Sequence, residues 1–475
     1  MIVRQEEFES THSGLRILNM SVEYAGSSIE ENSNINFTLS HDGSTIGTYD
    51  LGGVDVGLPS SRDEAYAHDS SNAYQAPADF VAFLQNALAG DDSPLYLAFA
   101  SPSGYLPAVP WERLLVPHLQ IPVLRLPGLP IRPITPQSNL TIAYCITLPI
   151  AKERQPPELV LNQFIDQLPT YNAMRAKSHV FADKQLIPHL ERFKSRLAHS
   201  GAIEVHDPDN AAKYGVAARR RDIADRGNRF DSPWLLWMRD ELAETGIDGV
   251  HFLCHGYLGK TRGGLSVAES PMLNEDLSSA RFVGTRQLGY FLEELGAWCV
   301  FFSCPPQNYS PAGMRMLQNE MSAVLPLPTV IHEMDHDPQG AALQAAYPFV
   351  FDEKNCPPPA ISGAISVVCP PSWILPDQSQ GADHLNTLFD DLTLAGRMKE
   401  PLRQSATLPG WVTAAQRSLE RAVANVSIKP SNSIEAAEQE GSESALRFMA
   451  DLFASHAMQA TTPNPAPVES EEEKK

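Results

Sequence analysis

The chain has 475 residues, and its 43% apolar and 20% charged content is typical of a folded protein rather than a disordered one. Its formal net charge of −21 opposes direct binding to nucleic acid or anionic membrane surfaces, because these attract Lys and Arg. No run approaches the roughly 20 apolar residues that span a bilayer, and Glu6, Glu7 and Glu9 stand where a secretory signal would be basic or apolar, so we expect a cytoplasmic protein without membrane contact.

The first segment, residues 1–76, is predicted to be small and β-rich. Apolar and polar residues alternate over much of 14–60, and Asp42-Gly43 between two such runs is typical of a tight hairpin turn. Residues 59–76 are rich in Ser, Asp, Asn and Ala and have few large apolar residues, which is typical of a connector. We therefore place a boundary near residue 76.

Residues 77–380 alternate between helical and strand patterns and are predicted to form the main domain. Helices are expected at 79–88, 186–197, 232–244, 285–295 (with Thr285 as N-cap) and 311–324, with another opening at Asp337-Pro338. Strands are expected at 95–100, 139–148, 249–254, 298–302 and 329–331. Strands separated by helices of this length predict an α/β fold with a mostly parallel sheet flanked by helices.

The strand patterns stop after about residue 380. Residues 381–460 are predicted to be a C-terminal helical segment, with amphipathic helices at 411–426 and 445–458. Residues 461–475 are rich in Pro, Glu and Lys and are predicted to be a disordered tail.

Two apolar runs of the main domain end in reactive side chains. One run delivers His255 followed by Gly256, and the other delivers Cys304. The interval between them has the length of a βαβ unit, so neighbouring parallel strands would place both side chains at the same edge of the sheet. A histidine beside a thiol can act as its base, and the N–H groups of Gly256 and Cys304 could hold an oxyanion. The alternative is that both are ordinary buried core residues.

These segments, Phe252-Leu253-Cys254-His255-Gly256 and Phe301-Phe302-Ser303-Cys304, resemble the CHAT domain family of caspase-like cysteine peptidases, of the same clan as caspases and separases. The strand at 95–99, the Pro110-Trp111-Glu112 element after it, and the segments 329–337 and 339–351 also resemble that family, over roughly residues 77–370. The chain departs from the family pattern with Ser303 in place of a small alanine and with Pro305-Pro306 after the cysteine.

The resemblance implies a caspase-like fold and a thiol protease whose catalytic residues are His255 and Cys304. It implies a protein substrate and a role in bacterial antiviral defence or cell death. An activator or sensor would be a separate protein or one of the flanking segments of this chain. A catalytically silent scaffold with the same fold is the alternative. The hydrolysis of a peptide bond by this pair requires no metal and no other cofactor.

Two further motifs lie outside the proposed dyad. His332-Glu333-Met334-Asp335-His336 matches the zinc-peptidase pattern, but that pattern requires a helix, and the strand before it and Asp337-Pro338 after it disfavour one. Glu333, Asp335 and Asp337 could instead line a pocket for a basic substrate residue; the alternative is a solvated turn and helix N-cap. The loop with Arg219, Arg220, Arg221 and Arg226 is a candidate for self-cleavage or simply a solvated loop.

The six cysteines are scattered, with no short regular spacing. They are Cys145, Cys254, Cys299, Cys304, Cys356 and Cys369. We interpret them as reduced thiols rather than a disulfide framework.

Overall fold

The computed structural model describes fourteen stretches of the chain. These are residues 17–24, 34–41, 44–100, 102–128, 139–148, 156–168, 175–197, 202–214, 231–243, 245–259, 262–272, 280–306, 311–351 and 363–371. The arginine-rich loop, the predicted C-terminal helices and the predicted tail lie outside them.

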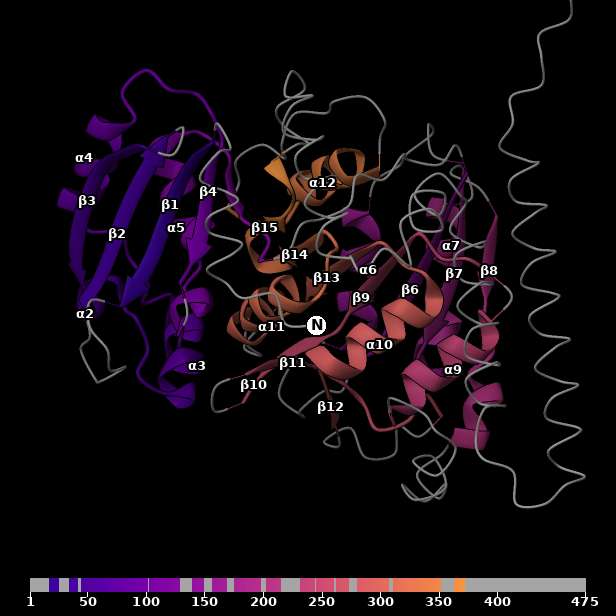
Figure 1. Cartoon of the computed structure of the whole chain (residues 1–475). Helices are drawn as coiled ribbons and strands as arrows, with labels where there is room; N and C mark the ends of the chain where they lie inside the picture. Colours follow the sequence, from indigo (N-terminus) through magenta and orange to yellow (C-terminus); the bar gives the residue numbers. More distant parts are fainter. Residues whose placement is uncertain are drawn as a thin grey trace, which may run out of the picture.

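One twelve-stranded sheet runs through all of the described body (Figure 1). In spatial order its strands are β3 (Ser44–Gly52), β2 (Asn34–His41), β1 (Leu18–Tyr24), β4 (Leu95–Phe99), β5 (Val123–Arg125), β15 (Ile365–Val368), β14 (Thr329–Glu333), β13 (Cys299–Cys304), β9 (Gly249–Leu253), β6 (Asn139–Ile146), β7 (Arg175–Ala182) and β8 (Ile203–Val205). The strands from β14 to β8 are mutually parallel. This confirms the predicted α/β class.

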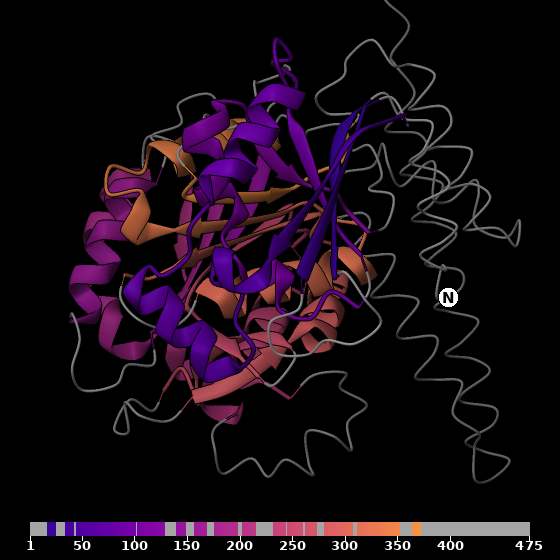
Figure 2. The ribbon, with the colours of Figure 1, turned by 90° about the vertical axis from the view of Figure 1, so that its left-hand side faces the viewer.

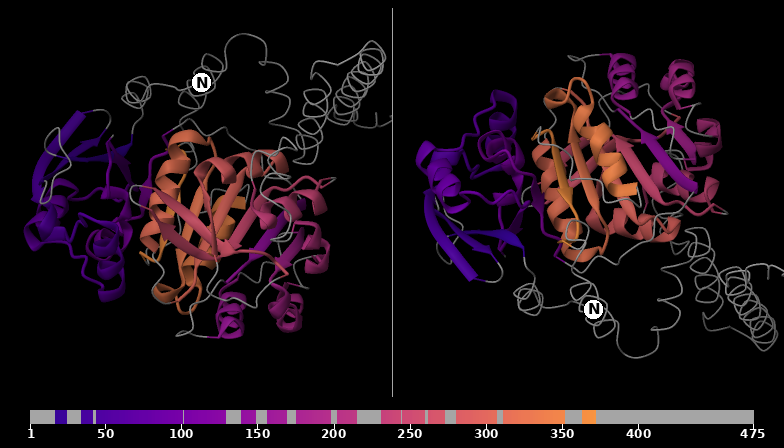
Figure 3. Two further views of the ribbon diagram at one scale, coloured as in Figure 1. Left: turned by 90° about the horizontal axis from the view of Figure 1, so that it is seen from below. Right: turned by 90° about the horizontal axis from the view of Figure 1, so that it is seen from above.

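The direction of the sheet reverses between β14 and β15, which pair antiparallel. Beyond that point β15, β5, β4 and β1 are again parallel to one another. The sheet therefore joins two blocks of opposite direction. The view from above places the orange strands β14 and β15 between the indigo N-terminal strands and the magenta ones (Figure 3).

The N-terminal lobe, residues 17–128, is built around strands β1 to β5. β2 and β3 form the predicted hairpin, with His41 opposite Ser44. Their buried side chains share one core with helices α4 (Ala78–Ala87) and α5 (Trp111–Leu119), in which Phe37 packs against Phe80 and Trp111. The boundary placed near residue 76 falls inside this lobe.

The expected connector at 59–76 contains a helix, α3 (Arg62–Ser71), which the composition did not predict. Its ends explain why it forms, because the Ser61 hydroxyl caps the N–H of Glu64 and Asn72 ends the helix in the left-handed region at φ 52°. α3 buries only Ala65 completely. Because α3 has no apolar stripe, hydrophobic periodicity did not predict this helix.

Helices cover both faces of the C-terminal half of the sheet (Figure 2). On one face, α6 (Pro157–Gln167), α7 (Glu191–Leu197) and α12 (Ala341–Phe351) share a core with alternate side chains of the strands. On the other face are α9 (Pro233–Glu241), α10 (Thr285–Leu295) and α11 (Pro311–Val324).

Three predicted helix starts differ from the structure. The helix expected to open at Asp337-Pro338 is α12, which begins at Ala341. The helix expected at 186–197 is a 3-10 segment, η2 (Lys184–His189), followed by α7, and Pro188 within it removes a helical hydrogen-bond donor. The N-cap of α10 is Gly284 rather than Thr285, whose hydroxyl donates instead to Glu320 at 3.0 Å.

A small antiparallel sheet separates β9 from α10. It consists of β10 (His255–Leu258), β11 (Gly263–Ala268) and β12 (Ala280–Gly284), and the sequence did not predict it. The short elements are α2 (Gly53–Val56), η1 (Leu106–Ala108), η3 (Pro208–Tyr214) and η4 (Met334–His336). Among the described helices, none has the length and apolar character needed to cross a membrane.

Candidate functional site

The topology brings the two predicted catalytic residues to one edge of the sheet. β9 and β13 are neighbouring parallel strands, with Phe252 opposite Phe302 and Leu253 opposite Ser303. The N–H of Cys254 donates to the Ser303 carbonyl at 3.4 Å. Cys304 is the last residue of β13, and His255 opens β10 two positions after Leu253, the last residue of β9.

This edge is also where an α/β sheet usually binds ligands. From β6 the chain proceeds through β7 and β8 in one direction, and then returns to place β9, β13 and β14 on the other side of β6. The strand order therefore switches between β6 and β9, and such a switch opens a crevice at the carboxyl ends of the strands. His255 follows the carboxyl end of β9 after one intervening residue, Cys254.

The Cys304 thiol is enclosed in the described structure. The cysteine is 2% exposed and His255 is 6% exposed. Burial raises the pKa of the Cys304 thiol well above its usual value, and the nearby carboxylates of Glu333 and Asp69 raise it further. A raised pKa favours the neutral thiol, which is a weak nucleophile.

Helix α11, which follows Cys304, packs backbone to backbone on the small sheet that carries His255. A Cβ added at Gly313 would lie 2.5 Å from the carbonyl carbon of Tyr257, and one added at Gly263 would lie 2.2 Å from the Gly313 oxygen. Only glycine allows this approach. The segments after the two candidate catalytic residues are thus held together directly.

Helix α3 of the N-terminal lobe contacts both of these segments. The Tyr66 hydroxyl donates to the Leu258 carbonyl at 3.1 Å and accepts from the Leu258 N–H at 3.0 Å, which fixes the end of β10. The Asp69 carboxylate accepts from the N–H of Ala312 at 2.9 Å, in the first turn of α11. The N-terminal lobe therefore fixes the segments that follow His255 and Cys304.

A buried ionic cluster lies beside Cys304. Arg315 of α11 is 1% exposed and donates to Glu333, to Asp69 at 2.6 Å and to the Ala108 carbonyl at 2.6 Å. Arg113 lies 3.3 Å from the other oxygen of Glu333. Burial raises the pKa of Glu333, but the two guanidinium groups together hold it below its usual value. The sequence analysis identified Glu333 but not its arginine partners, of which Arg315 lies 18 positions and Arg113 220 positions away in the chain.

The three acidic residues proposed for a substrate pocket have different environments. Glu333 is neutralised by the arginines, and Asp335 is exposed. Asp337 accepts from the N–H groups of Ala342 and Leu343, at 3.0 and 3.1 Å, at the start of α12. Asp337 therefore caps the N-terminus of α12, which is the alternative to a pocket residue. Of the three acidic residues, only Asp335 is exposed to solvent.

A second group of polar side chains crosses the sheet on the α12 side, and no sequence pattern predicted it. His251 contacts the Tyr347 hydroxyl at 2.6 Å and the Ser303 hydroxyl at 2.8 Å. Ser303 in turn contacts His332 Nδ1 at 3.1 Å. His332 Nε2 lies 3.2 Å from Asp337. Because these side chains are buried, we interpret their hydrogen bonds as structural contacts that stabilise the packing of strands β9, β13 and β14.

The His332–His336 motif does not form the geometry of a zinc peptidase. His332 is on strand β14 and His336 is on the 3-10 segment η4, so the two imidazoles do not share an α-helical face. In the described residues, the histidine and carboxylate side chains grouped closely enough to hold a metal ion are His179, Glu204 and His206, at the β7–β8 edge.

The cysteines of the described residues, Cys145, Cys254, Cys299, Cys304 and Cys369, are buried, and none of them forms a disulfide. No protein-family model, curated protein or solved structure matches the chain.

Proposed function

We propose that this chain is a cysteine endopeptidase of the CHAT, caspase-like type, which cleaves a partner protein with His255 and Cys304 as its catalytic pair. The observation that carries the proposal is the position of both residues at the matching carboxyl ends of adjacent parallel strands, beside the topological switch point. The motif resemblance around these residues supports it. A cytoplasmic role in bacterial antiviral defence or cell death belongs to the same proposal.

The proposed reaction is acyl transfer to the thiol followed by hydrolysis. His255 accepts the proton of Cys304 Sγ, and the thiolate attacks the carbonyl carbon of the scissile bond. The N–H groups of Gly256 and Cys304 donate to the oxyanion that forms. His255 then gives the proton to the leaving amine, and a water molecule hydrolyses the thioester to restore the thiol and release the carboxylic acid.

The enclosure of Cys304 supports a gated enzyme. A 2% exposed neutral thiol cannot meet a polypeptide substrate, so activation requires the segments around it to move. α3 contacts the ends of both segments through Tyr66 and Asp69. We propose that an activator protein acts by shifting these contacts.

The same observation also favours the second candidate, a catalytically silent scaffold. A thiol whose pKa is raised by burial and by two carboxylates resembles the structural cysteines Cys254 and Cys299, whose pKa values burial also raises. In this alternative, the edge of the sheet recognises a partner without cleaving it.

Cleavage of a diverse peptide library, followed by mass spectrometry, separates the two candidates. The assay compares the wild type, Cys304→Ala and His255→Ala with a control, Cys254→Ala. This control removes a buried thiol next to His255 in the sequence. A peptidase gives a common residue before the cleaved bond with the wild type and Cys254→Ala, and no cleavage with the other two variants. The digestion is repeated with lysate of the native cells added, which could supply an activator. Identical digests for all four proteins under both conditions would favour the scaffold.

A further inference from the structure

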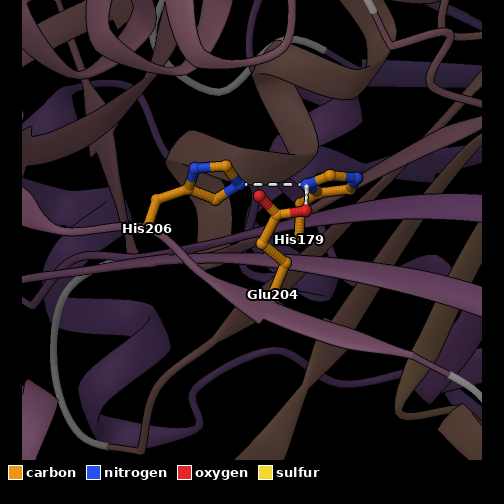
Figure 4. A group of neighbouring side chains, drawn as sticks. All are labelled: His179, Glu204 and His206. Carbon is orange, nitrogen blue, oxygen red and sulfur yellow. Dashed lines mark hydrogen bonds and ion pairs between the residues drawn. The ribbon is translucent and has the colours of Figure 1, made fainter.

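Two histidines and a glutamate converge at the far edge of the sheet, away from the proposed dyad (Figure 4). His179 lies on β7 directly opposite Glu204 of β8. His206 follows β8 two residues after Glu204, so the alternation of a strand returns its side chain to the same face. The short pairing of β7 with β8 thus creates the cluster.

The donor atoms are spaced as metal ligands. His179 Nδ1 lies 2.9 Å from His206 Nε2 and 3.6 Å from Glu204 Oε2, and the three donor atoms are all within 4.8 Å of one another. Zinc bonds to nitrogen and carboxylate oxygen of about 2.0–2.2 Å, at tetrahedral angles, separate ligand atoms by roughly 3.3 Å. A cation therefore fits between these atoms after small side-chain shifts.

A surrounding layer of contacts orients His206. Its Nδ1, on the opposite side of the ring from the cluster, lies 3.3 Å from Glu241 of α9. Its ring stacks on Phe181, with centroids 4.2 Å apart and planes 3° from parallel. Metal-binding histidines commonly use their second nitrogen in this way, which fixes the ring and leaves the first nitrogen for the ion.

The burial of the three residues differs in a way that suits binding from solvent. His179 and His206 are 2% and 6% exposed, whereas the Glu204 side chain is 51% exposed. Lys177 pairs with Glu204 at 3.0 Å on this open side. The simpler alternative is a hydrogen bond between two stacked histidines, with Glu204 held mainly by its ion pair with Lys177.

We infer that His179, Glu204 and His206 bind one divalent first-row transition metal ion, with Zn²⁺ the best match to two imidazoles and a carboxylate. Three protein ligands leave a fourth coordination position open on the Glu204 side. The ion would fasten β8, which pairs with β7 through only three residues, to the edge of the sheet. This inference does not depend on the proposed peptidase activity.

The test is a zinc-binding titration of the full chain, without an affinity tag, after removal of metals with a chelator. A chromogenic chelator competes for Zn²⁺, and elemental analysis gives the stoichiometry. The wild type is compared with Glu204→Gln and Glu241→Gln. Glu204 is half exposed, so its substitution leaves the fold intact, and circular dichroism verifies this. His118→Asn, at an exposed histidine of α5, is the matched control.

We expect one Zn²⁺ per chain, and an unchanged affinity for His118→Asn. Glu241→Gln should weaken binding by about 10-fold, as loss of an outer contact to a ligand does, and Glu204→Gln by more than that. At the same Zn²⁺ concentration, the midpoint of thermal unfolding should rise more for the wild type than for Glu204→Gln. Absence of stoichiometric binding to the wild type, or equal affinity in Glu204→Gln, would overturn the inference and leave the hydrogen-bonded histidine pair.

Discussion

Arg315→Met tests whether the ionic cluster beside Cys304 joins the two halves of the molecule. In the wild type, the guanidinium of Arg315 bridges Asp69 and the Ala108 carbonyl of the N-terminal lobe to Glu333 of β14. Methionine keeps an unbranched apolar chain in that place but removes the charge and all three donated hydrogen bonds. The two carboxylates, each 8% exposed at the side chain, then lose their principal counter-charge.

The size of the effect follows from burial. Breaking a buried ion pair by removing one partner costs about 3–5 kcal/mol, because the remaining charge stays in a poorly solvated place. Here Arg113 still lies 3.3 Å from Glu333, and Asp69 still accepts from the N–H of Ala312. These remaining contacts place the expected loss near the lower end, about 3 kcal/mol.

The assay is urea unfolding of the wild type and Arg315→Met, together with hydrogen exchange of the 62–71 segment. We expect a lower unfolding midpoint and faster exchange in α3, whose residue Asp69 has lost its ion pair. The matched control is Arg192→Met, which breaks an ion pair with Asp166 whose side chains are each 52% exposed. Exposed pairs contribute only about 0–1 kcal/mol.

A loss for Arg315→Met that is no larger than that for Arg192→Met would refute this reasoning. Unchanged exchange in α3 would refute the bridging role in particular.

Three further predictions concern the same region. Gly313→Ala should cost about 1–3 kcal/mol and lower any peptidase rate, because its Cβ would meet the backbone of β10 at 2.5 Å. Gly284→Ala, whose Cβ would meet no atom within 4 Å, should cost less than about 1 kcal/mol, since only the N-cap of α10 changes, and should leave any peptidase rate unchanged. Tyr66→Phe removes both hydrogen bonds to β10 and should cost about 1–3 kcal/mol in thermal unfolding. Because the folded-state pKa of Glu333 is lowered, its stabilising contribution is present above its unfolded pKa and is lost as pH falls; Glu333→Gln should therefore flatten the acid side of the stability profile measured by urea unfolding.

Long apolar runs and strong helical periodicity made much of the fold predictable. The helix expected at 311–324 matches α11, and the runs ending at His255 and Cys304 are the adjacent strands β9 and β13. Two of the elements that escaped prediction, α3 and β8, lack such patterns, whereas α6 was not predicted although its buried residues have helical spacing. β8 has three residues, and α3 is polar on most of its surface.

The contacts around the candidate site were less predictable than its position. Apolar strand endings indicate where His255 and Cys304 lie, but no local pattern pairs Arg315 with Asp69, which is 246 positions away. The hydrogen bonds that link His251, Ser303 and His332 likewise depend on which strands are neighbours. A single sequence predicts which residues end a strand more readily than which strands become neighbours.

Covalent labelling of Cys304 tests the central proposal most directly. Peptidyl acyloxymethyl ketones with Arg or Asp next to the reactive group are incubated with the wild type, Cys304→Ala and His255→Ala, alone and in lysate of the native cells, and the adduct is located by mass spectrometry. We predict an adduct on Cys304 of the wild type with one of the two probes, absent from Cys304→Ala and strongly reduced in His255→Ala. No adduct on wild-type Cys304 under either condition, or equal labelling of Cys304→Ala, would contradict the proposed peptidase.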